Sequence, residues 1–197
     1  MFIDKFETYA EGDYTYRNFV TLSKDELLLI LRERNHPDVK KWMFNNEDIQ
    51  EGDHLAFVEG LKNRNDAYYW LMEYKGGPIG VLSLIHINYE MEEGETGYYL
   101  FASHQDSGLG LDMQFHYKKL FFSHLGVRNL PGEILWGNTN AYQMSLFFGA
   151  EVDGTMEREG RKYVVMHTSK ENFEKIEGRK LTSKFIKYIK SHPVSWE

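Results

Sequence analysis

The 197-residue chain contains no cysteine and has no long hydrophobic run. The lack of cysteine excludes disulfide bonds, thiolate metal sites and cysteine nucleophiles. No apolar run approaches the ~20 residues of a transmembrane helix. Residues 1–9 have neither the basic start nor the apolar body of a signal peptide. We therefore expect a cytoplasmic protein that does not interact with a membrane.

Basic residues are also fewer than acidic ones, with 23 Lys and Arg residues and 30 Asp and Glu residues. The net charge of −7 argues against nucleic acid or an anionic membrane surface as the principal partner. Aromatic residues, in contrast, are abundant, with 13 Tyr and 13 Phe. Together with a hydrophobic content of 42%, they indicate one ordered domain and suggest an aromatic-lined pocket.

Strand and helix patterns follow one another along the whole chain. Ser23 and Glu26 form a capping-box motif that predicts the start of a helix, and Pro37 requires that helix to end. In order, we expect a loose lead-in (1–13), a strand (14–22), helices (23 to about 36 and 49–62), strands (67–74, 79–88 and 96–102), a glycine loop and long helix (105–125), a strand (133–137), a helix (138–148), a hairpin (150–158 and 162–168) and a partly helical tail (169–197).

This order of elements predicts an α/β or α+β domain. Its sheet should be mixed but mostly antiparallel, with helices on both faces. The sequence shows no internal repeat and no linker that would divide the chain.

A glycine loop before the long helix is the strongest local motif, formed by Gln105, Asp106, Ser107, Gly108, Leu109 and Gly110. Two glycines let backbone N–H groups approach a ligand, and the start of a helix offers unpaired donors and the positive end of its dipole. It is not a Walker loop, because no Gly-Lys-Ser/Thr follows, and it lacks the third glycine of a dinucleotide fingerprint. The loop therefore predicts a phosphate-binding site.

The pattern Q-x-x-G-x-G resembles the acyl-CoA pyrophosphate loop of the GNAT superfamily of N-acetyltransferases. A second signature of that family is matched by Asn138 and Ala141, and by Phe148 and Gly149 at the end of the same helix. The resemblance implies a GNAT domain over residues 14–177, a C-terminal helical extension over 178–197, and acetyl-CoA as co-substrate. It implies that the cofactor contacts Leu100, Phe101, Ala102, Gln105, Asp106, Ser107, Gly108, Leu109, Gly110 and Asn138.

The first half of the chain narrows this resemblance. Segments 34–37, 42–44 and 54–57 are similar to N-acetyltransferases that acetylate the 4-amino group of a UDP-linked amino-deoxysugar in pseudaminic acid biosynthesis. By this likeness Met43, Phe44 and Phe57 line the acceptor pocket with Tyr98, although all four could instead be core residues. Basic groups are needed for the diphosphate, and the candidates are Arg34, Lys40 and Lys41.

The expected reaction is direct attack of a neutral amine on the thioester, with an oxyanion stabilised by backbone N–H groups. The family usually has a tyrosine that protonates the leaving thiolate, but Ser145 stands at that position, and a serine is a poor proton donor. Tyr142, or water held by Ser145 or Asn138, could replace it, and an impaired enzyme is a further alternative.

The base that deprotonates the amine cannot be read from the sequence. The pseudaminic family has an acidic residue where this chain has Gly137. Other acidic and imidazole groups are expected to be solvated or structural rather than catalytic, namely Glu92, Glu93, Glu95, His36, His54, His86 and His104. No grouping has metal-ligand spacing, so no metal is expected.

Three functions stay open at this point. The leading one is acetyl-CoA-dependent N-acetylation of a nucleotide-linked amino-sugar, with small molecules as the partners. The second is acetylation of a protein N-terminus or another small amine, for which an open acidic groove is expected. The third is a CoA-binding protein that has lost catalysis. A homodimer contact is one role open to the tail.

Overall fold

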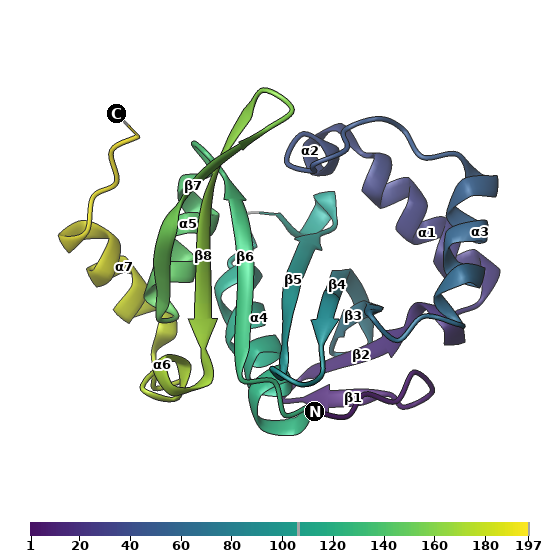
Figure 1. Cartoon of the computed structure of the whole chain (residues 1–197), viewed down its shortest axis with the longest axis horizontal. Coiled ribbons are helices and arrows are strands. Elements are labelled where there is room, and N and C mark those ends of the chain that lie inside the picture. The colour runs from purple at the N-terminus through teal and green to yellow at the C-terminus, as the bar shows by residue number, and fades with distance from the viewer. Residues whose placement is uncertain (106, 197) are drawn as a thin grey trace.

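The computed structural model describes residues 1–105 and 107–196. Eight strands form one sheet in the order β1-β2-β3-β4-β5-β6-β8-β7 (Figure 1), and neighbours are antiparallel except for the parallel pair β5–β6. The mixed, mostly antiparallel sheet confirms the expected fold class. The strands are β1 (Tyr9–Glu11), β2 (Tyr14–Asn18), β3 (Ala67–Tyr74), β4 (Gly77–Asn88), β5 (Glu93–Leu100), β6 (Asn129–Leu135), β7 (Ala150–Arg158) and β8 (Arg161–Ser169).

The first long helix begins and ends where the sequence predicts. The Ser23 hydroxyl accepts a hydrogen bond from the Glu26 N–H at 3.3 Å, and the Glu26 carboxylate accepts one from the Ser23 N–H at 2.8 Å. The helices are α1 (Lys24–Asn35), α2 (Pro37–Lys40), α3 (Glu51–Leu61), α4 (Leu109–Lys119, continued by a π-turn, Leu120–His124), α5 (Thr139–Phe147), α6 (Lys170–Glu174) and α7 (Leu181–Ser191).

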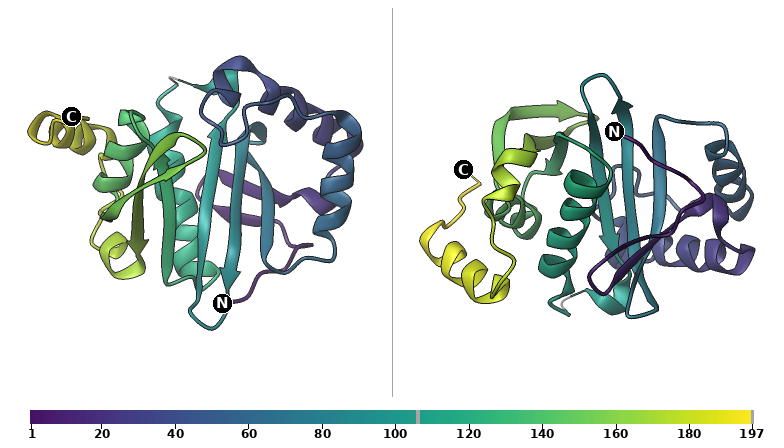
Figure 2. Two further views of the ribbon diagram at one scale, coloured as in Figure 1. Left: turned by 45° about the horizontal axis from the view of Figure 1, so that its top comes forward. Right: turned by 90° about the horizontal axis from the view of Figure 1, so that it is seen from below.

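Helices cover both faces of the sheet, as expected (Figure 2). Alternation along β3 and β4 sends Leu71 and Val81 into one hydrophobic cluster with α1 and α3. The next residues along each strand, Met72 and Leu82, enter a second cluster with α4. These four residues are almost completely buried, so hydrophobic packing covers both faces of β3 and β4.

The sheet opens between β5 and β6. These two strands share one registered pair, Glu93 with Asn129, and no further register joins them among the described residues. Beyond this point β5 stays paired with β4 as far as Leu100, whereas β6 pairs with β8. The two halves of the sheet therefore diverge toward the carboxyl ends of β5 and β6.

Residues 1–13 are not a loose lead-in. They contain β1, which pairs with β2 from Tyr9 opposite Tyr16 to Glu11 opposite Tyr14. Glu11 is buried and binds Lys119 at 2.6 Å, so a long-range ion pair holds a segment without its own periodic pattern. The strand expected over 14–22 ends earlier, at Asn18, where a 3₁₀ turn begins.

The strand expected over 96–102 is shifted toward the N-terminus, because β5 runs from Glu93 to Leu100. The tail forms α6 and α7, and α7 packs on α5 through Phe147, whose ring centroid lies 5.3 Å from that of Phe185. Within the described residues, no helix is both long enough and apolar enough to cross a membrane.

Candidate active site

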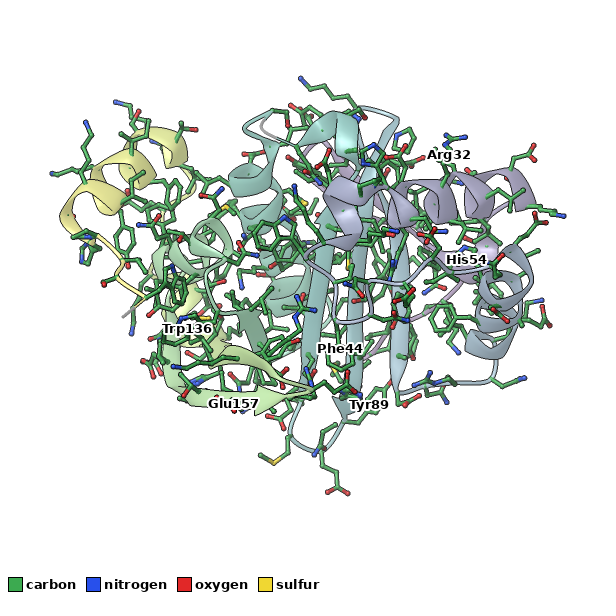
Figure 3. All side chains as sticks on the ribbon, turned by 90° about the horizontal axis from the view of Figure 1, so that it is seen from above. Arg32, Phe44, His54, Tyr89, Trp136 and Glu157 are labelled. Carbon is green, nitrogen blue, oxygen red and sulfur yellow. The ribbon has the colours of Figure 1, made fainter. Side chains whose placement is uncertain are left out.

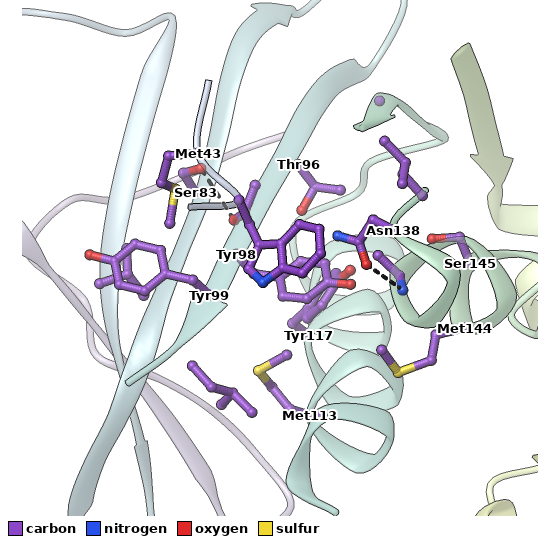
Figure 4. A pocket seen from close by; sticks show the side chains of 18 of the residues that line it. Met43, Ser83, Thr96, Tyr98, Tyr99, Met113, Tyr117, Asn138, Met144 and Ser145 are labelled. Atoms are coloured by element: carbon purple, nitrogen blue, oxygen red, sulfur yellow. Dashed lines mark hydrogen bonds between the residues drawn. The ribbon is translucent and has the colours of Figure 1, made fainter. Parts of the chain in front are cut away.

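A cavity of about 1070 Å³ occupies the opening between β5 and β6 (Figure 4). Its walls come from both halves of the sheet, from α4 and α5, and from the segment after α2. It brings together most of the side chains that the sequence singles out: Arg34, Met43, Phe44, Phe57, Tyr98, Leu100, Gln105, Gly108, Gly110, Asn138 and Ser145.

The glycine loop forms the start of α4. Gly108 caps the helix with a left-handed conformation, φ +80°, which only glycine adopts without strain. The Ser107 hydroxyl donates to the His104 carbonyl at 2.6 Å and accepts from the Leu109 N–H at 3.3 Å. These bonds fix the loop at the start of α4, whose first N–H groups have no partners within the helix. Gly108 and Gly110 line the cavity at this helix end. Asp106, also predicted to bind the cofactor, lies outside the described residues.

The end of β5 lines the opening with Tyr98, Tyr99 and Leu100, and it also has backbone groups on its β6 side. The Phe101 N–H donates to the Ile79 carbonyl at 2.8 Å, across the β4–β5 pair. Because N–H groups alternate along a strand, that of Leu100 points toward the divergent β6 side. The side chain of Phe101 is buried in the α1 and α3 cluster, and the Ala102 N–H donates to Glu33 at 3.2 Å. Phe101 and Ala102 therefore do not line the cavity, in contrast to the expectation.

Asn138 begins α5 and faces the cavity. Its side-chain oxygen accepts a hydrogen bond from the Ala141 N–H at 3.2 Å, so its amide NH₂ group is free to point inward, as Figure 4 shows. Ser145 lies two turns further along the same wall. Both residues therefore line the same wall of the cavity.

Tyr142 does not reach the cavity. Its ring packs against Trp196 at a centroid distance of 5.1 Å and borders a separate hollow under the C-terminal segment. The proximity in sequence to Ser145 is misleading, because the helix places Tyr142 on the side covered by the tail. Tyr142 is therefore not a candidate proton donor.

One part of the cavity has an exposed aromatic wall. Trp42, Phe44 and Phe57 are 49%, 46% and 38% exposed, so the alternative that Phe44 and Phe57 are core residues is wrong. The Phe57 ring meets Tyr69 edge-on at 5.1 Å. Figure 3 shows Phe44 beside the tip of the β7–β8 hairpin, where the guanidinium of Arg158 lies 4.4 Å from the Phe44 ring.

The three basic candidates for a diphosphate all have protein partners. Arg34 donates to the carbonyls of residues 45 and 47 and lines the cavity. Lys40 pairs with Asp48 at 2.6 Å and does not line it, while Lys41 lines it and pairs with a carboxylate in the exposed α2 segment. Arg34 is thus held as part of the wall, with its remaining donors available to a ligand.

Among the imidazole groups, His54 alone lines the cavity within the described residues. Its Nε2 is buried without a hydrogen-bond partner, and burial lowers its pKa. His36 caps α2, and His86 forms an exposed pair with Glu95 at 3.0 Å. Neither position, nor that of His104, is part of the cavity wall.

Two buried polar residues of α4 were not predicted from the sequence: Lys118, which lines the cavity, and Gln114, which does not. Gln114 donates to the Tyr98 hydroxyl at 2.5 Å, and Lys118 donates to the Thr168 hydroxyl at 3.3 Å. Tyr117 lies between them on α4 and is fully buried. Their spacing could have predicted their burial. Gln114 and Lys118 follow Leu111 by three and seven positions, which places these polar residues on the apolar face of the helix.

The family of the chain follows from a match to the model of the acetyltransferase (GNAT) domain, which covers residues 17–151. The chain belongs to the GNAT family of acetyltransferases. It is therefore an N-acetyltransferase that uses acetyl-CoA as co-substrate. Among residues 1–105 and 107–196, no group of three or more His, Cys, Asp or Glu side chains is arranged to bind a metal ion.

Two kinds of acetyltransferase resemble this one. Acetyltransferase PseH of Campylobacter jejuni is 29% identical over 128 residues, which are 65% of this chain and 78% of that protein. The crystal structure of PseH in complex with acetyl coenzyme A superimposes with a TM-score of 0.62 at 18% identity, over 79% of this chain and 98% of that one. The structure of spermidine N-acetyltransferase from Vibrio cholerae, in complex with CoA and spermine, superimposes with a TM-score of 0.72 at 16% identity, over 82% of this chain and 98% of that one. These structural matches establish the shared fold.

Proposed function

We propose that this acetyltransferase transfers an acetyl group from acetyl-CoA to the amino group of a nucleotide-linked amino-deoxysugar. The acceptor is held in the aromatic half of the cavity, and acetyl-CoA enters from the side of α4 and α5. The sequence similarity to PseH supports an amino-sugar nucleotide, whereas the spermidine N-acetyltransferase neighbours share the fold at lower identity.

The charge of the cavity wall is the observation that carries the choice of acceptor. Within the described residues, Glu133 is the one carboxylate in the wall, and its charge is neutralised by Arg158. The charged basic groups in the wall are Arg34 and Lys41, and Lys118 adds a buried amine. A polyamine or the N-terminus of a peptide carries positive charge and favours an acidic groove, whereas a nucleoside diphosphate is repelled by one.

The aromatic wall fits the rest of such an acceptor. Trp42, Phe44 and Phe57 offer exposed ring faces on which a pyrimidine base can stack and a deoxysugar methyl group can pack. Arg34 keeps donors for phosphate oxygens next to this wall.

The proposal also covers the cofactor side of the cavity. In it, the first N–H groups of α4, with Gly108 and Gly110, bind the pyrophosphate. The Leu100 N–H and the Asn138 amide bind the pantetheine arm and the oxygen of the thioester, on which negative charge develops during attack. Ser145 lies beyond Asn138 and can hold a water near the departing sulfur.

Nucleotide binding gives a direct test that needs no acceptor. UDP should bind with a micromolar to millimolar Kd by calorimetry and compete with the acceptor but not with acetyl-CoA. Thiol release should be at least about 100-fold more efficient with a UDP-linked 4-amino-sugar than with spermidine or an amine-bearing peptide. Phe57→Ala should weaken UDP binding about tenfold and leave the KM for acetyl-CoA unchanged. Preference for spermidine, with no UDP binding, would contradict the proposal.

A further inference from the structure

Lys118 lies where the two halves of the sheet come together at the closed end of the cavity. Only 3% of its surface is exposed, and it lines the cavity wall. Its amine donates to the Thr168 hydroxyl. Thr168 is paired with Leu130, the residue after the Asn129 that joins β6 to β5. The long side chain of Lys118 thus extends from α4 to the place where β5 and β6 begin to diverge.

No acidic side chain balances this amine. Among the described residues, no carboxylate lies within ion-pair distance of it, and Glu133 in the same wall is bound to Arg158. The cavity-lining residues of β5 and β8 are uncharged, and Glu133 is the one charged residue that β6 contributes to the lining. The Tyr117 ring lies 5.5 Å from the Lys118 amine on the same helix. Burial alone lowers the pKa of Lys118 to about 7. At neutral pH much of the population holds an uncharged amine in the cavity.

Lys118 shares the cavity wall with the polar side chains of Thr96, Tyr117 and Asn138. Figure 4 shows Thr96, Tyr117 and Asn138 directed toward a common space. The Thr96 hydroxyl and the Gln114 carbonyl oxygen are buried without a protein partner. Buried polar atoms of this kind are normally satisfied by ordered water. Hydroxyl groups and water can therefore form a continuous path for a proton between Lys118 and the thioester.

We propose that Lys118 holds the proton that the acceptor ammonium group must lose before it attacks acetyl-CoA. The ammonium N–H bond breaks, the proton passes through water and hydroxyl groups to the Lys118 amine, and the acceptor nitrogen gains its lone pair. That nitrogen forms the bond to the carbonyl carbon, and the carbon–sulfur bond breaks. The thiolate takes the second proton from the nitrogen, and Lys118 releases its own proton to solvent after the products leave. Lys118 does not contact the acceptor in this scheme. It receives the proton through the intervening groups and is therefore a positioning residue.

The inference rests on the N-acetyltransferase activity and not on the identity of the acceptor. Its kinetic test compares Lys118→Met with Lys119→Met, the same change at the next residue of α4, where the side chain is half exposed and pairs with Glu11. With any amine that wild type acetylates, Lys118→Met should lower kcat at pH 7 about 100-fold and leave the KM for acetyl-CoA within twofold. Lys119→Met should match wild type.

The pH profile separates this role from a structural one. In wild type, kcat should rise through pH 7 as Lys118 loses its proton and becomes able to accept another. In Lys118→Met the rise should move to higher pH, toward the pKa of the acceptor amine, and the rate should approach that of wild type there. Lys118→Arg, which stays charged, should be slow at every pH. An unchanged profile in Lys118→Met, or a loss equal at all pH values, would overturn the proposal.

Two readouts do not depend on turnover. In NMR spectra of protein with isotope-labelled lysine, the signal absent from Lys118→Arg should titrate near pH 7 in wild type, and a titration near the usual pKa of lysine would refute the inference. The melting temperature of Lys118→Met at pH 7 should be at or above that of wild type, since an unpaired buried amine is removed. Lack of turnover with every amine would refute the proposed function and leave the titration to decide the state of Lys118.

Discussion

At the scale of single residues, the cavity contains side chains that do not contribute to the stability of the fold. Lys118 has a pKa of about 7 in the folded chain and an ordinary value of 10.5, so the unfolded chain binds the proton more tightly. This difference costs roughly 5 kcal/mol of stability at and below pH 7. The cost declines as the pH rises and disappears near pH 10.5. A group that opposes folding to this extent is more readily understood through chemistry than through packing.

Ser145 is the second such residue, because it faces the cavity where the family usually has a tyrosine. If protonation of the departing thiolate limits the rate, Ser145→Tyr should raise kcat about tenfold, since a phenol is a far better proton donor than a serine hydroxyl. Ser145→Phe adds the same ring without the hydroxyl and should not raise kcat. The measurement is kcat from thiol release at saturating substrates. Equal rates for the tyrosine and phenylalanine variants would show that no proton donor is missing.

At the scale of elements, α4 lines the cavity along most of its length, from Gly110 in its first turn, where we propose that the cofactor binds, to Tyr117 and Lys118 near its end. Gly110 lies in the first turn, and its backbone is not left-handed. A Cβ there would meet Leu100 at 3.9 Å and Met144 at 4.0 Å, which are ordinary contacts. Charge can therefore be introduced at this position without straining the backbone, unlike at Gly108.

The prediction is that Gly110→Glu weakens acetyl-CoA binding at least about 30-fold relative to Gly110→Gln. The two side chains have the same size, so the difference reports the repulsion between a carboxylate and the pyrophosphate, about 2 kcal/mol or more at close range. Calorimetry with acetyl-CoA measures it. The difference should become smaller in 0.5 M salt as the charges are screened. Equal affinities for both variants would mean that the pyrophosphate binds elsewhere.

Elements were largely predictable from the sequence because caps, turns and periodicity are local. The Ser23 capping box, the hairpins and the helix after the glycine loop are examples. The surroundings of side chains were not predictable, because they depend on contacts between distant segments. Tyr142 faces Trp196 rather than the cavity, and the face of α4 that carries Lys118 borders a cavity because β5 and β6 diverge. Nothing near either residue in the sequence encodes these contacts.

At the scale of the whole molecule, the two halves of the divergent sheet are joined again above the cavity. Arg161, at the start of β8, donates to the carbonyl of Met43 at 2.9 Å and to that of Phe44 at 3.3 Å. Arg158 packs on the Phe44 ring from the other strand of the hairpin. The β7–β8 hairpin thus holds the segment after α2, which carries cavity-lining Met43 and Phe44, and Figure 1 shows the hairpin tip next to this segment.

This bridge predicts that Arg161→Ala affects the acceptor more than the cofactor. Loss of two charge-assisted hydrogen bonds should free the segment that carries Met43 and Phe44, and the KM for the acceptor should rise about five- to tenfold. The KM for acetyl-CoA should change less than twofold, because its proposed contacts lie on α4 and α5. Arg64→Ala is the control, since Arg64 pairs with Asp66 outside the cavity. Hydrogen exchange should increase in residues 41–46 of Arg161→Ala alone, and an unchanged acceptor KM together with increased exchange would show that the acceptor does not use this wall.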